Sequence, residues 1–195
     1  MPLYQIHHSA PLTPSQQTLL AQGITSLHCS TFSAPSAFVN MTFHYNPPVS
    51  TPSSTPTTTI YVGGTPHRTN YILGHLRPRR NNAEKLAAVV RGITALWNEH
   101  VRSSISASTY TPKDSSAHLD NKAHLDATAR LDDPLALHNV FLMEDIVAGA
   151  EQGFLLPPAG RDLEWARENM GAFEGRAREG DESMGVLVRE YKGKL

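Results

Sequence analysis

The chain has 195 residues, of which 39% are hydrophobic, so it can bury one sizeable core, while 14 prolines and 13 glycines predict long loops. Its 17 Lys and Arg and 18 Asp and Glu leave a net charge of −1, which argues against nucleic acid or an anionic membrane as a partner. No apolar run is long enough to span a membrane, the first residues lack a signal-peptide pattern, and Cys29 alone excludes an internal disulfide, so we expect a cytoplasmic protein.

The beginning of the chain predicts a strand, a helix and a second strand. Apolar and polar side chains alternate over residues 2–8 and again over 38–45, which is typical of strands with one buried face. Between them, Thr13 and Gln16 have the spacing of a capping box, with a proline at the first helical position. The helix that begins there should run to about Cys29.

A second group of elements follows: strands at 59–62, 70–76 and 138–143 and a helix at 81–101. The helix has apolar side chains at helical spacing on one face, namely Leu86, Val89, Val90, Ile93 and Trp97. Together with the strands before and after it, this helix predicts a second β-α-β unit.

Three segments lie outside these units. Residues 46–58 are rich in proline and hydroxyl side chains, a composition typical of a linker. Residues 103–135 repeat His-Leu-Asp at an interval of six residues, which fits no helical period, and we expect a surface insertion there. Residues 161–179 are charged and helix-compatible, and we expect a peripheral tail at 161–195 attached to a single domain at 1–160.

The expected fold class is mixed α/β (α+β), built from two fused β-α-β units at about residues 2–45 and 59–144. Their strands can pair into one four-stranded sheet with both helices on one face. The other face would still present apolar side chains to solvent, so we expect the chain to form a homo-oligomer.

Pro2 is the first candidate catalytic residue. Removal of Met1, which methionine aminopeptidase carries out before small residues and proline, would leave Pro2 as a free secondary amine. Nearby cations or an apolar pocket would lower the pKa of this amine toward neutrality, so it could act as a general base, or as a general acid when protonated. The alternative is that Pro2 only begins a strand.

Further polar residues suit a small carboxylate substrate. Arg77, Arg79 and Arg80 follow a strand and precede a helix, where guanidinium groups and helix amides favour an anion. His28 can donate to a carbonyl or carboxylate, and Glu151, just past the last strand, could orient or activate a water molecule. A solvated basic turn, a helix-capping histidine and a surface glutamate are the simpler interpretations.

The histidines do not predict a metal site. His7 and His8 are adjacent on a strand, so their side chains point to opposite faces and cannot bind one ion together. His118 and His124 lack acidic or cysteine partners at ligand spacing. We therefore expect no bound metal.

Several segments match one known family: Pro2-Leu3-Tyr4, Ala21-Gln22-Gly23-Ile24-Thr25, Val62-Gly63-Gly64, Val140-Phe141-Leu142-Met143-Glu144 and, most sharply, Gly74-His75-Leu76-Arg77-Pro78-Arg79-Arg80. Over about residues 2–101 and 136–158, the chain resembles the tautomerase superfamily, and within it the branch of cis-3-chloroacrylic acid dehalogenase and its fungal relatives. The resemblance implies two fused β-α-β units, a homotrimer, and neither a metal nor an organic cofactor.

The resemblance also implies roles for individual residues. Pro2 would be the acid/base, and His28 would help to bind the substrate. Arg77 and Arg80, which are three positions apart, would hold the substrate carboxylate, with Arg79 as a bystander.

The same resemblance implies two further positions that act on a water molecule in the family. A water-activating glutamate maps onto Glu151 once one residue is dropped from the alignment. Where the family has a tyrosine that assists this water, the chain has Phe141, which lacks a hydroxyl. This departure argues against hydrolytic dehalogenation and leaves proton transfer by Pro2 untouched.

We therefore expect an enzyme that acts on a small 2-oxo or unsaturated carboxylate by keto-enol tautomerisation, with hydration or dehalogenation of 3-haloacrylate-type acids as a second activity. The alternative from another class is a non-catalytic binding or signalling protein on the same scaffold. Retention of Met1 would block the amine of Pro2 and favour that alternative.

Overall fold

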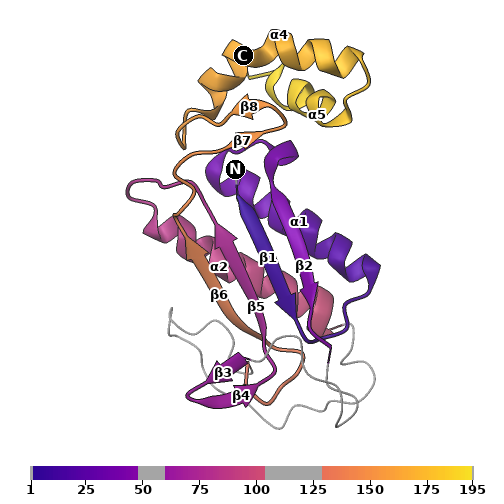
Figure 1. Cartoon of the computed structure of the whole chain (residues 1–195), viewed down its shortest axis with the longest axis vertical. Helices are drawn as coiled ribbons and strands as arrows, with labels where there is room; N and C mark the ends of the chain where they lie inside the picture. The colour runs from indigo at the N-terminus through magenta and orange to yellow at the C-terminus, as the bar shows by residue number, and fades with distance from the viewer. Residues whose placement is uncertain (1, 48–59, 104–128, 195) are drawn as a thin grey trace.

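A four-stranded sheet with two long helices on one face forms the body of the molecule (Figure 1). The computed structural model describes residues 2–47, 60–103 and 129–194. Most of the linker expected at 46–58 and most of the insertion expected at 103–135 lie outside the described residues.

The first half of the sheet comes from β1 (Leu3–His8), α1 (Pro14–Phe32) and β2 (Asn40–Tyr45), with a short 3₁₀ turn, η1 (Ser36–Phe38), before β2. β1 and β2 are parallel. The predicted capping box is present: the Gln16 N–H donates to Thr13 Oγ1 at 3.2 Å, and the Thr13 N–H donates to Gln16 Oε1 at 2.8 Å. This cap sets the start of α1, and His28 consequently lies on its buried face.

The second half comes from β5 (Asn70–His75), α2 (Ala83–Trp97) and β6 (Leu137–Met143), with a π turn, η2 (Asn98–Arg102), after α2. β5 and β6 are parallel, and β5 runs antiparallel to β1, which joins the halves in the order β2-β1-β5-β6. The short strands β3 (Ile60–Val62) and β4 (Thr65–His67) form a separate hairpin. The predicted fold of two β-α-β units is therefore confirmed.

The main core fills the space between the sheet and helices α1 and α2. Its fully buried side chains come from both layers and include Tyr4, Ile6, Leu20, Ile24, Ile72, Ile93 and Trp97. The opposite face of the sheet carries the alternate residues of each strand. On it the His7 ring stacks between the rings of His44 and Tyr71, with centroid distances of 4.5 Å to each.

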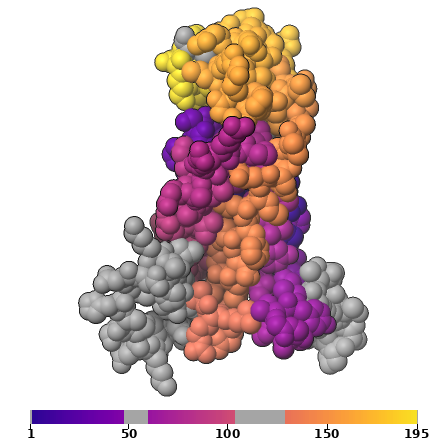
Figure 2. Space-filling model, turned by 90° about the vertical axis from the view of Figure 1, so that its left-hand side faces the viewer, coloured from indigo at the N-terminus to yellow at the C-terminus, as the bar shows by residue number. Residues whose placement is uncertain are grey.

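The C-terminal part of the chain covers one end of the sheet. The hairpin of β7 (Ala150–Glu151) and β8 (Phe154–Leu155) is followed by α4 (Asp162–Arg178) and α5 (Glu182–Tyr191), and we call these two helices the C-terminal cap. The cap lies where β1 begins, as Figure 1 shows, and Figure 2 shows it stacked on that end of the body.

A second apolar core holds the cap together and attaches it to η1: Phe38, Trp165, Ala166, Phe173, Met184, Leu187 and Tyr191. The Ser36 N–H also donates to Glu190 Oε2 of α5 at 3.0 Å. None of the helices in the described ranges is long and apolar enough to cross a bilayer.

Candidate active site

Pro2 is buried at the start of β1, beside the start of β2. Its carbonyl accepts a hydrogen bond from the Asn40 N–H at 3.1 Å. The side-chain Nδ2 of Asn40 donates to both carboxylate oxygens of Glu151 at 3.1 Å. Asn40 therefore contacts Pro2 with its backbone and Glu151 with its side chain, and it brings two of the expected catalytic residues to one place.

Glu151 is positioned by a tight hairpin. It is the last residue of β7, and the two turn residues that follow, Gln152 and Gly153, have φ angles of 49° and 91°. Two positive φ values are typical of a type I′ turn. Burial raises the pKa of Glu151, while the hydrogen bonds from Asn40 and the positive amino terminus act in the opposite direction. The carboxylate is therefore a stronger base than an exposed glutamate.

His28 is bonded to Tyr4 inside the protein. The Tyr4 hydroxyl and His28 Nδ1 are 2.9 Å apart, and both side chains are almost completely buried. The pKa of His28 is lowered to about 3, mainly by burial and also by the positive charges of Arg79, the amino terminus and Arg77. Burial likewise raises the pKa of Tyr4. Both groups are neutral at physiological pH.

Arg79 is the guanidinium that lies beside His28. Its Cζ sits 4.5 Å from the centre of the Phe32 ring, and that ring packs on His28 with a centroid distance of 4.8 Å. The Arg79 backbone N–H donates to Glu144 Oε1 at 2.7 Å, which fixes the loop between β5 and α2. Within the described residues, Arg79 Nη2 is buried without a hydrogen-bond partner.

Arg77, which was expected to hold a substrate carboxylate, is engaged by the C-terminal segment. Its Nη2 donates to Asp162 Oδ1 and its Nη1 to the Pro157 carbonyl, both at 2.6 Å. Arg77 and Asp162 are each only 6% exposed. Arg80, the other expected carboxylate ligand, is exposed to solvent on the same loop. The two arginines therefore occupy different environments, and Arg79 is the arginine that lies beside His28.

Phe141 lies on the other side of the sheet. It belongs to β6, is 56% exposed, and pairs with Leu73, which in turn pairs with Gln5 of β1. Because side chains alternate along a strand, this row faces away from Tyr4 and from helix α1. The structure therefore brings Pro2, His28 and Glu151 to one end of the sheet and leaves Phe141 on the open face.

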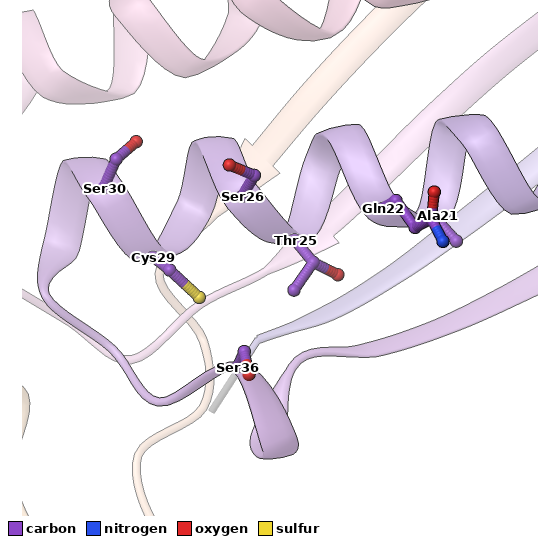
Figure 3. A pocket seen from close by; sticks show the side chains of 7 residues that line it. All are labelled: Ala21, Gln22, Thr25, Ser26, Cys29, Ser30 and Ser36. Carbon is purple, nitrogen blue, oxygen red and sulfur yellow. The ribbon is translucent and has the colours of Figure 1, made fainter. Parts of the chain in front are cut away.

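A groove of about 580 Å³ runs along the outer side of α1 (Figure 3). Small and polar side chains line it: Ala21, Gln22, Thr25, Ser26, Cys29, Ser30 and Ser36. None of the expected site residues is among them. Burial raises the pKa of the Cys29 thiol to about 11, so it is not a thiolate nucleophile at neutral pH. Over the described ranges, no group of three or more His, Cys, Asp or Glu side chains could hold a metal ion.

Sequence reasoning missed Asn40 and Asp162. Asn40 belongs to a strand whose alternation predicts a face but not a partner, and Asp162 lies 85 positions from Arg77 without any motif. The sequence predicts Arg77 and Arg80 as the carboxylate ligands, because their three-residue spacing resembles the family pattern. Nothing in the sequence around Arg79 distinguishes it from a solvated arginine.

A known family model matches the part of the chain that carries Pro2, His28 and Arg79. The family model described as "Putative oxalocrotonate tautomerase enzyme" matches residues 1–125. Because this match covers more than half of the chain, the chain belongs to that tautomerase family, as the resemblance predicted. A comparison with curated protein sequences gave no match.

Solved structures share the fold. N1, a member of the cis-3-chloroacrylic acid dehalogenase family, is 15% identical with a TM-score of 0.56, over 91% of this chain and 99% of that one. Native RhCC from Rhodococcus jostii RHA1 is 17% identical with a TM-score of 0.50, over 86% and 96% of the two chains. A fused 4-OT described as a symmetric trimer is 15% identical with a TM-score of 0.50, over 82% and 99%. At these identities the likeness concerns the fold alone.

Proposed function

We propose that the protein is a tautomerase-superfamily enzyme in which Pro2, freed by removal of Met1, transfers protons on a small 2-oxo or unsaturated carboxylate. The observation that carries this proposal is the electrostatic surroundings of His28: its pKa is lowered by burial, by Arg79, by the amino terminus and by Arg77. Two guanidinium groups and the start of the chain therefore act electrostatically on one buried imidazole. Cations around an amine lower its pKa and also attract an anionic substrate.

In the proposed mechanism, Arg79 binds the substrate carboxylate with its unpartnered Nη2, and Arg80, exposed on the same loop, adds its positive charge at the surface. Arg77 contributes its positive charge but no direct contact while Asp162 holds it. As negative charge moves from the reacting carbon onto the oxygens in an enolate, these guanidinium groups stabilise it.

His28 orients the 2-oxo group. We assign the Tyr4 hydroxyl as the donor to Nδ1, so the proton of the neutral imidazole is on Nε2. Nε2–H can then donate to the substrate carbonyl or enol oxygen. Protonated Pro2 gives its proton to the carbon of the enol form and becomes neutral, while the enol hydroxyl gives its proton to solvent water. In the reverse direction neutral Pro2 removes a carbon proton, and the oxygen takes a proton from water.

Hydration or dehalogenation of a 3-haloacrylate-type acid is the second candidate function. It is favoured by Glu151, whose pKa is raised by burial and whose carboxylate is held by Asn40. Phe141 supplies no hydroxyl for such a reaction and lies on the open face of the sheet. We keep Phe141 in the proposal as an apolar residue that another copy of the chain would cover in a homotrimer, the assembly named for the fused 4-OT.

The test is turnover by the processed protein. Mass spectrometry of the intact chain establishes whether Met1 is absent, and ketonisation of phenylenolpyruvate is then followed by absorbance. Pro2→Ala should reduce kcat/KM by at least about tenfold, the lower end of general acid–base effects. Pro11→Ala, at an exposed proline after β1, is the matched control and should retain activity. Equal rates for Pro2→Ala and the wild type would remove the catalytic role, and retained Met1 would favour a non-catalytic binding protein.

A further inference from the structure

Asp162 places a carboxylate of the protein itself on Arg77. The Asp162 Oδ1 accepts from Arg77 Nη2, and the Pro157 carbonyl accepts from Arg77 Nη1. Arg77 Nε is buried without a partner among the described residues. The guanidinium fork therefore already binds one carboxylate oxygen in the manner of an anionic ligand.

The surroundings of the Arg77–Asp162 pair make its separation unfavourable. Asp162 is the first residue of α4, and Trp165 and Ala166, one turn later, belong to the core that attaches the C-terminal cap to Phe38. Because both members of the pair are nearly inaccessible, withdrawal of Asp162 would leave a buried guanidinium uncompensated, which is strongly unfavourable. A small carboxylate from solution would have to overcome this loss to reach Arg77.

The Arg77–Asp162 pair reduces the number of positive charges that are available to bind a ligand. Arg77 and Arg79 both lie close enough to His28 to lower its pKa, and Asp162 also lies within electrostatic reach of Arg79. Asp162 cancels the positive charge of Arg77, the more deeply buried of the two guanidinium groups. One guanidinium, that of Arg79, then remains to bind a carboxylate beside His28.

We propose that Asp162 determines the charge of the accepted substrate: by neutralising Arg77 it restricts the site to a monocarboxylate held by Arg79. This inference rests on the proposed function and specifies its substrate class. Asp162 lies outside residues 1–125, which match the tautomerase family, so it is a feature of the C-terminal cap of this chain. A dicarboxylate would bring a second negative charge, but Arg77, the other guanidinium that acts on His28, is already paired with Asp162.

The test compares two unreactive acids, propionate and malonate, at constant ionic strength and at a pH where both are fully ionised. Dissociation constants are measured by NMR titration for the wild type, Asp162→Asn and the double variant Arg77→Met/Asp162→Asn. Glu164→Gln is the matched control, since Glu164 lies in the same first turn of α4 but pairs with Arg161 at the surface. A circular dichroism spectrum confirms that each variant is folded.

The wild type and Glu164→Gln should bind malonate no more tightly than propionate. Asp162→Asn should favour malonate over propionate by at least about tenfold relative to the wild type, because a full positive charge becomes available to the second carboxylate. The double variant removes both charges, so it should keep the wild-type preference and bind propionate within about twofold.

An unchanged preference in folded Asp162→Asn would overturn the inference. If that variant does not fold because Arg77 is left unpaired, the double variant decides: a loss of propionate binding by about tenfold or more would show that Arg77 itself contacts the ligand. The proposed function is judged separately by turnover of Pro2→Ala. Loss of turnover in Pro2→Ala with no effect of Asp162 would leave the enzyme proposal standing and remove the charge selection alone.

Discussion

The contact between Tyr4 and His28 makes a prediction that can be tested without knowledge of the substrate. Tyr4→Phe removes the hydroxyl that lies 2.9 Å from His28 Nδ1 and keeps the ring in place. Tyr4 is 0% exposed and His28 is 2% exposed, so water cannot replace the lost partner readily. The variant should therefore leave a buried polar atom unsatisfied, which destabilises the folded state by about 1–3 kcal/mol.

Tyr191 provides the matched control. It is also buried, at 3% exposure, but its hydroxyl has no hydrogen-bond partner among the described residues. Tyr191→Phe removes a buried hydroxyl that makes no bond, so its stability should be equal to or slightly above that of the wild type. The two substitutions delete the same atom from the same residue type, and only the presence of a partner differs.

Thermal denaturation followed by circular dichroism measures the difference. For a chain of this size, about 1 kcal/mol corresponds to about 2–4 °C in Tm, so Tyr4→Phe should lower Tm by about 4–8 °C for a loss near 2 kcal/mol. Tyr191→Phe should lie within about 1 °C of the wild type or above it. Equal losses in the two variants, or no loss in Tyr4→Phe, would refute the assignment of this hydrogen bond as stabilising.

Two further predictions concern titratable groups. His28 takes up a proton only near pH 3 in the folded protein, but near pH 6.5 in the unfolded chain. The free energy of unfolding should therefore fall by about 2 kcal/mol between pH 6.5 and pH 5. Urea titrations should show this pH dependence of the free energy of unfolding in the wild type but not in His28→Gln. Asn40→Ala removes both hydrogen bonds to Glu151 and should raise the pKa of that carboxyl. The acidic limb of the pH profile of any hydration activity should then move to higher pH, and kcat for hydration should fall by about tenfold. Ketonisation by Pro2 should be unaffected. An unshifted pH profile in Asn40→Ala would contradict a positioning role for Asn40.

The fold followed from local signals. The alternation around residues 2–8 and 38–45, the capping box at Thr13 and Gln16, and the apolar spacing of the second helix each depend on neighbours in the sequence. Such signals specify the helices and strands and the face that each buries. Two similar β-α-β units can then combine into one sheet in only a few topologies. The strand expected at 59–62 formed, but it pairs with β4 instead of the main sheet. The two are joined by Gly63-Gly64, whose φ angles of 58° and 80° are typical of a two-residue hairpin turn.

Only those residues of the candidate site that belong to a recognisable motif could be predicted from the sequence. Pro2, His28 and Glu151 are the residues that the resemblance to a known family predicts, and the fold brings them to one end of the sheet. The environment of Arg77 could not be deduced, since it depends on Asp162 in a helix at the far end of the chain. The sequence after residue 160 is charged and compatible with a helix. That its apolar residues form a core with Phe38 could not be predicted, because Phe38 is distant in the sequence.

The surroundings of His28 bear on the amine of Pro2 as well. A base loses affinity for protons when it is buried and when cations are near, and both causes act on His28. Pro2 is buried at the same end of the sheet, so we expect the same causes to lower the pKa of its amine once Met1 is removed. A bound carboxylate on Arg79 would cancel part of the positive charge and raise that pKa again, which favours the protonated amine when a substrate is present. The substrate would thereby promote the protonation state in which Pro2 can deliver a proton to carbon.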